Sequence, residues 1–211
     1  MIDSKFIKYF SIFLVWLFTI SGIFGILSEG YSDWFLSMTS INLLLLFVIV
    51  IINIKSFKPI YSIAFSIPFF IGFITEALGV NFGLIFGSYT YGENLGLKVV
   101  GVPVMICLNW ALLTAITSDV ASCFSKNRVL KASIGALLMT LLDGAIEISA
   151  PRFDFWEFDG GVVPVQNYVG WFIVAFIAHM IYQQFKVKTD KQVSWHILTS
   201  MVIFFITFLI F

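Results

Sequence analysis

The sequence predicts an all-α integral membrane protein with about seven transmembrane helices, a cytoplasmic N-terminus and a C-terminus outside. Of its 211 residues, 60% are hydrophobic and only 11% are charged, whereas a soluble domain is typically about 45–50% apolar and about 25% charged. This leaves too little polar surface to face water, so a bilayer must solvate the excess. Acidic and basic residues balance at 12 each, and no strongly basic region indicates a nucleic-acid partner.

Seven apolar windows are long enough for spanning helices, each of which needs about 20 residues. The windows are roughly Phe6–Leu27, Trp34–Ile54, Pro59–Gly79, Val102–Phe124, Val129–Ala150, Asn167–Phe185 and Val193–Phe211. Their length favours helices over barrel strands, which need only about 10 alternating residues. Pro68 predicts a kink in the third window. We expect a single transmembrane domain over residues 1–211, without internal repeats.

Basic residues are concentrated in alternate connections between the windows, and this asymmetry determines the predicted orientation. Basic residues of the N-terminal tail and of every second connection are Lys5, Lys8, Lys55, Lys58, Lys126, Arg128, Lys131, Lys186, Lys188 and Lys191. The opposite side has only Lys98 and Arg152. The positive-inside rule therefore places the N-terminus in the cytoplasm. We expect the protein in the cytoplasmic (inner) membrane of a bacterium.

Four carboxyl groups fall inside the apolar windows, where a charge is costly and a functional site is the first interpretation. Asp119 lies near the predicted cytoplasmic end of its helix, which indicates an interfacial role. Glu76, Asp143 and Glu147 all fall in the outer half of the bilayer. Asp143 and Glu147 are four residues apart and share a helix face. Two carboxyls that close in a low dielectric do not both ionise readily, so one is expected to be a neutral acid.

Polar residues at a similar depth predict a cavity that opens outward. Asn109 lies about two turns into the fourth window, and Asn81 and Asn167 flank the long outer connections. Tyr89 and Tyr91 alternate within the first of these connections. A structural interpretation is that the acids only hold the bundle together, because buried polar contacts between membrane helices are common. Three acids at one depth favour a functional site.

The remaining chemistry-bearing residues indicate no further site. His179 and His196 have no partner at metal-ligand spacing, so we expect structural hydrogen bonds for both. Cys107 and Cys123 form no CxxC motif and belong to no His/Cys cluster, so no metal site is expected.

Two stretches of the chain resemble the carotenoid biosynthesis protein family, whose members include carotenoid 1,2-hydratases acting on γ-carotene and bisanhydrobacterioruberin. The first stretch reads Glu76-x2-Gly79-x3-Gly83-x3-Gly87-x-Tyr89-x-Tyr91, then Gly101-Val102-Pro103 and Asn109-Trp110. The second reads Asp143-x3-Glu147, then Asp154-Phe155-Trp156 and Val163-Pro164-x2-Asn167-Tyr168-x-Gly170-Trp171. Together they cover roughly Phe70 to Trp171, about half of the chain. Ile148 stands where the family commonly has a proline after the acid.

The resemblance implies a hydratase that adds water to the terminal C1=C2 double bond of an acyclic carotenoid, without a cofactor, among membrane lipids. Asp143 or Glu147 is then the proton donor, and Glu76 stabilises the carbocation or acts as the base for water. Asn109 and Tyr89 are expected to orient that water. The full set of expected substrate-binding residues is Asn109, Tyr89, Tyr91, Asn81, Trp110, Trp156, Asn167 and Trp171.

Three alternatives remain open at this point. Another proton-initiated enzyme acting on a carotenoid or other isoprenoid, such as a cyclase or isomerase, would use the same acids but exclude water. A non-catalytic carotenoid- or lipid-binding subunit would bind pigment without turnover. A small transporter would favour polar residues on both sides of the membrane midplane, whereas those of this chain gather on one side.

Overall fold

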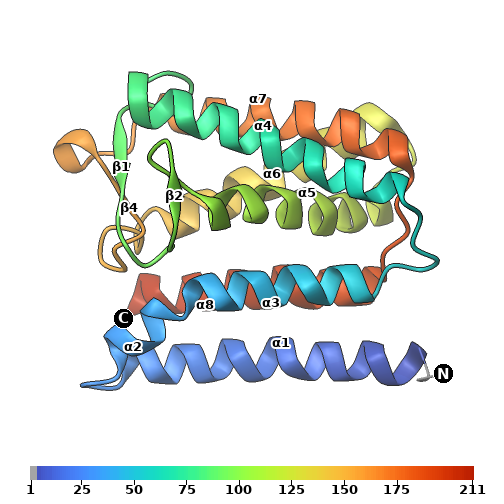
Figure 1. Ribbon diagram of the computed structural model, residues 1–211, viewed down its shortest axis with the longest axis horizontal. Helices are drawn as coiled ribbons and strands as arrows, with labels where there is room; N and C mark the ends of the chain where they lie inside the picture. Colours follow the sequence, from blue (N-terminus) through green and yellow to red (C-terminus); the bar gives the residue numbers. More distant parts are fainter. Residues whose placement is uncertain (1–3) are drawn as a thin grey trace.

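The computed structural model describes residues 4–211, so residues 1–3 of the predicted domain lie outside the described residues. The helices run along a common axis (Figure 1). They are α1 (Ser4–Leu27), α2 (Ser32–Ser37), α3 (Thr39–Ile52), α4 (Ile60–Phe82), α5 (Val104–Phe124), α6 (Arg128–Ile146), α7 (Val165–Tyr182) and α8 (Lys191–Ile210). Short elements are β1 (Tyr89–Tyr91), β2 (Lys98–Val99), β3 (Val102–Pro103), β4 (Trp156–Phe158), η1 (Asp159–Gly161) and η2 (Gln183–Phe185).

Six of the described helices are long and apolar enough to cross a membrane, and they confirm the predicted all-helical class. These helices are α1, α4, α5, α6, α7 together with η2, and α8. Helix α4 extends from Ile60 to Phe82 and includes Pro68, so this proline does not end the helix.

The second predicted window, Trp34–Ile54, is not one helix, because it is divided between α2 and α3. The hydroxyls of Ser37 and Thr39 each donate to a backbone carbonyl three residues earlier, at 2.7 Å, and such bonds compete with the helical ladder. Helix α3 has 14 residues, or about 21 Å at 1.5 Å per residue. That is less than the roughly 30 Å of a hydrocarbon core.

The fifth predicted window, Val129–Ala150, also extends beyond its helix. Helix α6 ends at Ile146, and the backbone then turns, with the Ser149 N–H donating to the Ile146 carbonyl at 2.9 Å. The helix therefore ends next to Glu147 although Ile148, rather than a proline, follows that acid.

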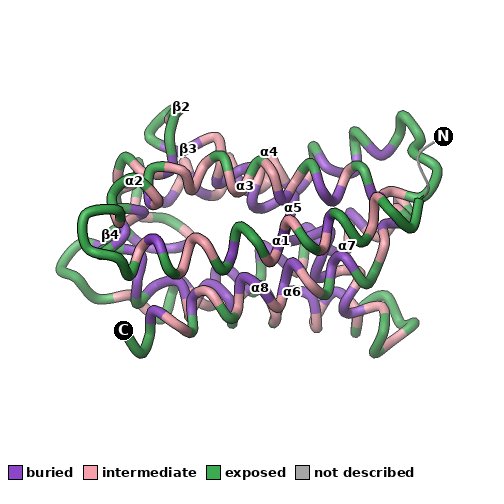
Figure 2. The backbone as a smooth tube through the Cα atoms, turned by 90° about the horizontal axis from the view of Figure 1, so that it is seen from below, coloured by how far each residue is buried: buried purple, intermediate pink, exposed green. Residues whose placement is uncertain are grey.

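Helix α5 is the centre of the bundle and contacts α3, α4, α6 and α8. Its backbone lies among buried segments of its neighbours (Figure 2). Small buried residues such as Ala111, Thr114 and Ala115 let these helices approach closely. Helix α1 instead lies at the edge of the bundle and packs mainly on α8 (Figure 1).

Both histidines make hydrogen bonds between helices, as predicted. The Nε2 atom of His179 in α7 lies 3.0 Å from the Thr117 hydroxyl of α5. His196 in α8 accepts a hydrogen bond of 3.0 Å from the Trp16 indole of α1. The polar side chains therefore join α5 to α7 and α1 to α8.

The strands gather at the end of the bundle opposite the N-terminus (Figure 1). Strand β1 pairs antiparallel with β4, although more than sixty residues separate them, and β2 pairs with β3. At the other end, the connections α3–α4 and α7–α8 meet, where the Lys55 N–H donates to the Lys188 carbonyl at 2.8 Å. The bundle thus has one basic end and one end covered by strands.

We predict that Gly135→Ala destabilises the protein, because the added Cβ would lie 2.5 Å from the Cε1 and Nε2 atoms of the buried His179 ring. Overpacking of this kind costs about 1–3 kcal/mol, and the melting temperature in detergent should fall by several degrees. Gly144→Ala on the same helix is the control, since its Cβ would meet Tyr168 at an ordinary 3.5 Å. Equal melting temperatures for the two variants would contradict this account of the α6–α7 contact.

Candidate active site

Glu76 is the centre of the first half of the site. It lies in the second half of α4 and is only 3% exposed. Its Oε2 accepts hydrogen bonds from the hydroxyls of Tyr89 and, at 2.8 Å, Tyr91. Its Oε1 accepts one from the Trp110 indole at 2.9 Å. Three donors compensate an ionised carboxylate, which buried without partners would be very costly.

The spacing of the first motif explains how these donors reach Glu76. Tyr89 and Tyr91 are two apart on β1, so they point to the same face of the strand. A Cβ at Gly79, one turn after Glu76, would lie 2.7 Å from the Tyr89 hydroxyl oxygen, so glycine lets the phenol cross α4. Gly83 then ends α4 in the left-handed conformation, with φ +65°, and turns the chain toward β1.

Both tyrosines act as hydrogen-bond donors because they stay protonated. Burial, and next the negative charge of Glu76, raise the pKa of the Tyr91 phenol well above its ordinary value. The same two causes raise the pKa of the Tyr89 phenol. Their hydroxyls therefore remain neutral donors to the Glu76 carboxylate.

Asp143 and Glu147 form the second half of the site. Asp143 lies in the last turn of α6 and is 2% exposed, and Glu147 caps that helix and is 6% exposed. The Asn167 amide nitrogen of α7 donates to Asp143 Oδ2 at 2.9 Å and to Glu147 Oε1 at 3.0 Å. The Trp156 indole of β4 donates to Glu147 Oε2 at 2.8 Å. One amide thus holds the two carboxyls together.

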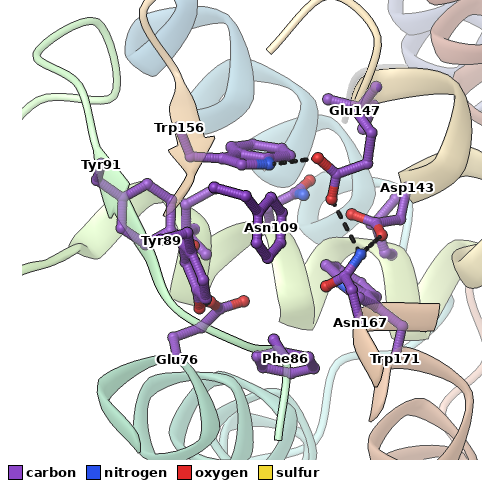
Figure 3. A pocket seen from close by; sticks show the side chains of 14 residues that line it. Glu76, Phe86, Tyr89, Tyr91, Asn109, Asp143, Glu147, Trp156, Asn167 and Trp171 are labelled. Carbon is purple, nitrogen blue, oxygen red and sulfur yellow. Dashed lines mark hydrogen bonds between the residues drawn. The ribbon is translucent and has the colours of Figure 1, made fainter. Parts of the chain in front are cut away.

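The two halves face each other across one pocket (Figure 3). Antiparallel pairing sets Tyr89 opposite Phe158 and Tyr91 opposite Trp156, so four rings from β1 and β4 form its outer wall. The lining residues are Glu76, Phe86, Tyr89, Tyr91, Ile106, Asn109, Leu113, Asp143, Ile146, Glu147, Trp156, Phe158, Asn167 and Trp171. The cavity volume is about 30 Å³, which is room for one or two waters.

Most residues expected from the sequence come together here. Trp110 does not line the cavity but lies behind it, where it holds Glu76 and stacks on Trp171 with ring centroids 4.3 Å apart. Asn81 is not brought to the pocket, because it is exposed and its amide donates to the Ala77 and Val100 carbonyls.

Sequence reasoning missed several apolar lining residues, among them Phe86 and Phe158. Phe158 carries a usable signal, since it is two residues after Trp156 and a strand places both on one face. Phe86 carries none in the sequence, because its contact with Trp110 and Trp171 depends on the path of the loop after α4.

Two oxygens in the pocket stand apart from this network. Asp143 Oδ1 and Asn109 Oδ1 are buried without a hydrogen-bond partner among residues 4–211. Both residues line the cavity. Unpaired buried oxygens beside space for water provide places where a small polar molecule can be bound.

The site as a whole is suited to acid chemistry on an apolar molecule. A positive charge that develops in the pocket would be stabilised by buried carboxylates and by the faces of the aromatic side chains. Among the described residues, no group of three or more His, Cys, Asp or Glu is placed to hold a metal ion. Asp119 lies outside the pocket, where its Oδ2 accepts hydrogen bonds from Thr189 and, at 2.6 Å, from Ser194. The interfacial role of Asp119 stays a prediction.

Comparison with known proteins gives two matches. A family model described as "Carotenoid biosynthesis protein" matches residues 37–211. Bisanhydrobacterioruberin hydratase of Haloarcula japonica is 29% identical over 117 residues, which cover 51% of this chain and 39% of that relative. The match therefore spans well under half of the relative's length. No solved structure matches the chain.

We predict that Asn167→Leu destabilises the protein by about 2–5 kcal/mol, because it removes the shared donor and leaves buried carboxyl oxygens unpaired. The control is Asn109→Leu in the same pocket, which removes an oxygen that already has no partner and should leave stability unchanged or improved. Thermal unfolding in detergent measures both. An Asn109→Leu variant as unstable as Asn167→Leu would show that the amide bridge is not what stabilises this end.

Proposed function

Because the chain belongs to the carotenoid biosynthesis protein family, as its two motifs predicted, we propose that it is a membrane hydratase for an acyclic carotenoid. The reaction is addition of water to the terminal C1=C2 double bond of the end group. The observation that carries the proposal is the convergence of three buried carboxyls on one aromatic-walled cavity with room for water. The Haloarcula relative is a hydratase by name, which supports the same reaction.

The chemistry requires a proton before it requires water. Protonation of the alkene at C2 leaves a tertiary carbocation at C1, and water then adds to C1 to give a tertiary alcohol. A buried carboxylic acid is a suitable general acid for such a step, and Asp143 and Glu147 are the candidates. No redox change occurs, so this addition needs no cofactor.

Glu76 is suited to a different role from that of the pair. Its carboxylate receives three hydrogen bonds, so it is held as a fixed negative charge. A preorganised charge of this kind stabilises a carbocation without reorganisation during the reaction. The rings of Trp156 and Trp171, which also line the pocket, add cation–π stabilisation.

The polarity of the pocket favours hydration over cyclisation or isomerisation. A cyclase must keep water from the carbocation, whereas this cavity has room for water and the unpaired oxygens of Asp143 and Asn109. Product mass separates the two reactions, since hydration adds one water and cyclisation adds nothing. A non-catalytic binding subunit would change no pigment at all.

We also propose that the chain crosses the inner membrane of a bacterium seven times, with α2 and α3 together making the second crossing. The N-terminus is then cytoplasmic, and the strand-covered end with the pocket lies toward the outer face. The support is the placement of ten basic residues at the end opposite the pocket, compared with Lys98 and Arg152 at the pocket end.

We predict that co-expression with an acyclic carotenoid pathway, in a host without its own hydratase, yields a pigment heavier by one water. Glu76→Gln should lower the amount formed by about 10²–10³-fold, because it removes a charge that stabilises the carbocation. Mass spectrometry of extracted pigments measures both.

The matched control for this experiment is Glu93→Gln, since Glu93 is exposed and outside the pocket. Immunoblots of membranes should show equal amounts of each variant. Unchanged pigments from wild-type protein present in the membrane would refute hydration of the carotenoids supplied. Equal hydration by the Glu76 and Glu93 variants would refute only the role of Glu76.

The orientation gives a separate prediction. Alkaline phosphatase fused after Phe211 should be active, because that enzyme folds only outside the cytoplasm, whereas a fusion within the connection at Lys126 should be inactive. A green fluorescent protein at the same two sites should give the reverse pattern. Activity in the opposite pattern would overturn the proposed orientation.

A further inference from the structure

The hydrogen bonds of the site distinguish its three carboxyl groups from one another. Both oxygens of Glu147 accept hydrogen bonds, from the Trp156 indole at 2.8 Å and the Asn167 amide at 3.0 Å. Both oxygens of Glu76 also accept hydrogen bonds. Indole and amide N–H groups can only donate, and hydrogen bonds of this kind favour the ionised form of the carboxyl that accepts them.

Asp143 differs from both glutamates. Its Oδ2 accepts a hydrogen bond of 2.9 Å from Asn167, but its Oδ1 is buried without any partner among the described residues. An ionised oxygen in that position would be uncompensated in an apolar surrounding, which is very costly. A proton on Oδ1 removes that charge.

From this asymmetry we infer that Asp143 is the neutral acid of the pair and protonates the substrate from Oδ1, while Glu147 stays ionised. The inference rests on the proposed hydration and deepens it by naming the proton donor. Oδ1 is the oxygen of Asp143 that bears no dashed line in Figure 3, and Asp143 lines the cavity. The acidic proton is therefore carried by a residue of the cavity wall.

The reverse assignment conflicts with the donors around Glu147. A proton on Glu147 would remove the charge that the Trp156 indole N–H and the Asn167 amide N–H compensate. Hydrogen bonds to a neutral carboxyl are weaker than hydrogen bonds to a carboxylate. Ionised Asp143 would at the same time keep its unpaired oxygen, so the reverse assignment costs more at both residues.

The proposed step balances in atoms and electrons. The O–H bond of Asp143 breaks, the π electrons of the alkene form the new C2–H bond, and C1 becomes a tertiary cation. A water oxygen then bonds to C1, and the proton that water loses passes to the Asp143 carboxylate, which restores the acid. Asn109 Oδ1, which is buried and unpaired, accepts a hydrogen bond from that water and positions it.

The first test compares two amide substitutions in the co-expression assay. Asp143→Asn removes the donor and should lower hydration by about 10²–10⁴-fold. Glu147→Gln removes a neighbouring charge but leaves the donor in place, so the loss should be near tenfold, about the effect of one lost interaction. The opposite order, with Glu147→Gln inactive and Asp143→Asn active, would overturn the assignment.

The second test locates the proton without any turnover. Infrared spectra of purified protein, in a detergent that contains no carbonyl group, show the C=O stretch of a neutral carboxylic acid, which shifts in heavy water. The wild-type spectrum minus that of Asp143→Asn should contain this band. The wild-type spectrum minus that of Glu147→Gln should contain carboxylate bands instead. An acid band in the second difference spectrum would refute the inference.

The two tests keep the inference separate from the proposed function. A wild-type protein that hydrates no pigment would refute hydration, but the infrared comparison would still show which carboxyl holds the proton. Should Asp143→Asn fail to fold, the Glu147→Gln spectrum alone decides, because the acid band must survive in it. Loss of that band in the Glu147→Gln protein would refute the assignment.

Discussion

The need to satisfy three buried carboxyl groups governs the structure of the strand-covered end of this bundle. A carboxylate that leaves water for an apolar interior requires hydrogen-bond donors or a proton. Five side chains supply donors here, namely Tyr89, Tyr91, Trp110, Trp156 and Asn167. The strand pairing, the stacked tryptophans and the glycine on α4 place these donors. The contacts that hold this end of the bundle together therefore also position the hydrogen-bond donors of the candidate site.

The pocket has two kinds of wall. Its inner wall comes from the central helix α5 and its neighbours, which are held by close packing over their whole length. Its outer wall comes from β1 and β4, which are only three residues long and joined by a single short ladder. The cavity of about 30 Å³ has room for only one or two waters, so binding of the proposed carotenoid end group requires side chains to move.

The sequence predicted the helical class and indicated which buried acids to consider, because both inferences follow from local rules. Apolar windows mark spans, and an ionisable residue within a span marks a site. The spacing of Asp143 and Glu147 placed them on one helix face, and the structure gives them a common donor. Such features need only the period of a helix or a strand.

The features that the sequence did not reveal depend on contacts between distant segments. The break between α2 and α3 lies in the run Ser37-Met38-Thr39-Ser40, whose hydroxyl residues lower the hydropathy too little to end the predicted window. Asn81 has the depth of a site residue but points to a neighbouring loop. The proposed proton on Asp143 rests on counting hydrogen bonds around each oxygen, which requires all partners to be placed. Residue type and spacing do not reveal how many hydrogen bonds each oxygen accepts.

The origin of the donors has a consequence for how the protein is made. Glu76 takes its donors from residues 89–110, and the pair on α6 takes its donors from residues 156 and 167. Each half of the site therefore has the donors named here within one continuous stretch of chain. During synthesis, a chain extended as far as Trp110 already contains every partner that Glu76 uses. The ribosome thus delivers all the donors of Glu76 before those of the α6 pair, and the β1–β4 ladder and the Trp110–Trp171 stack form only after the second stretch has followed.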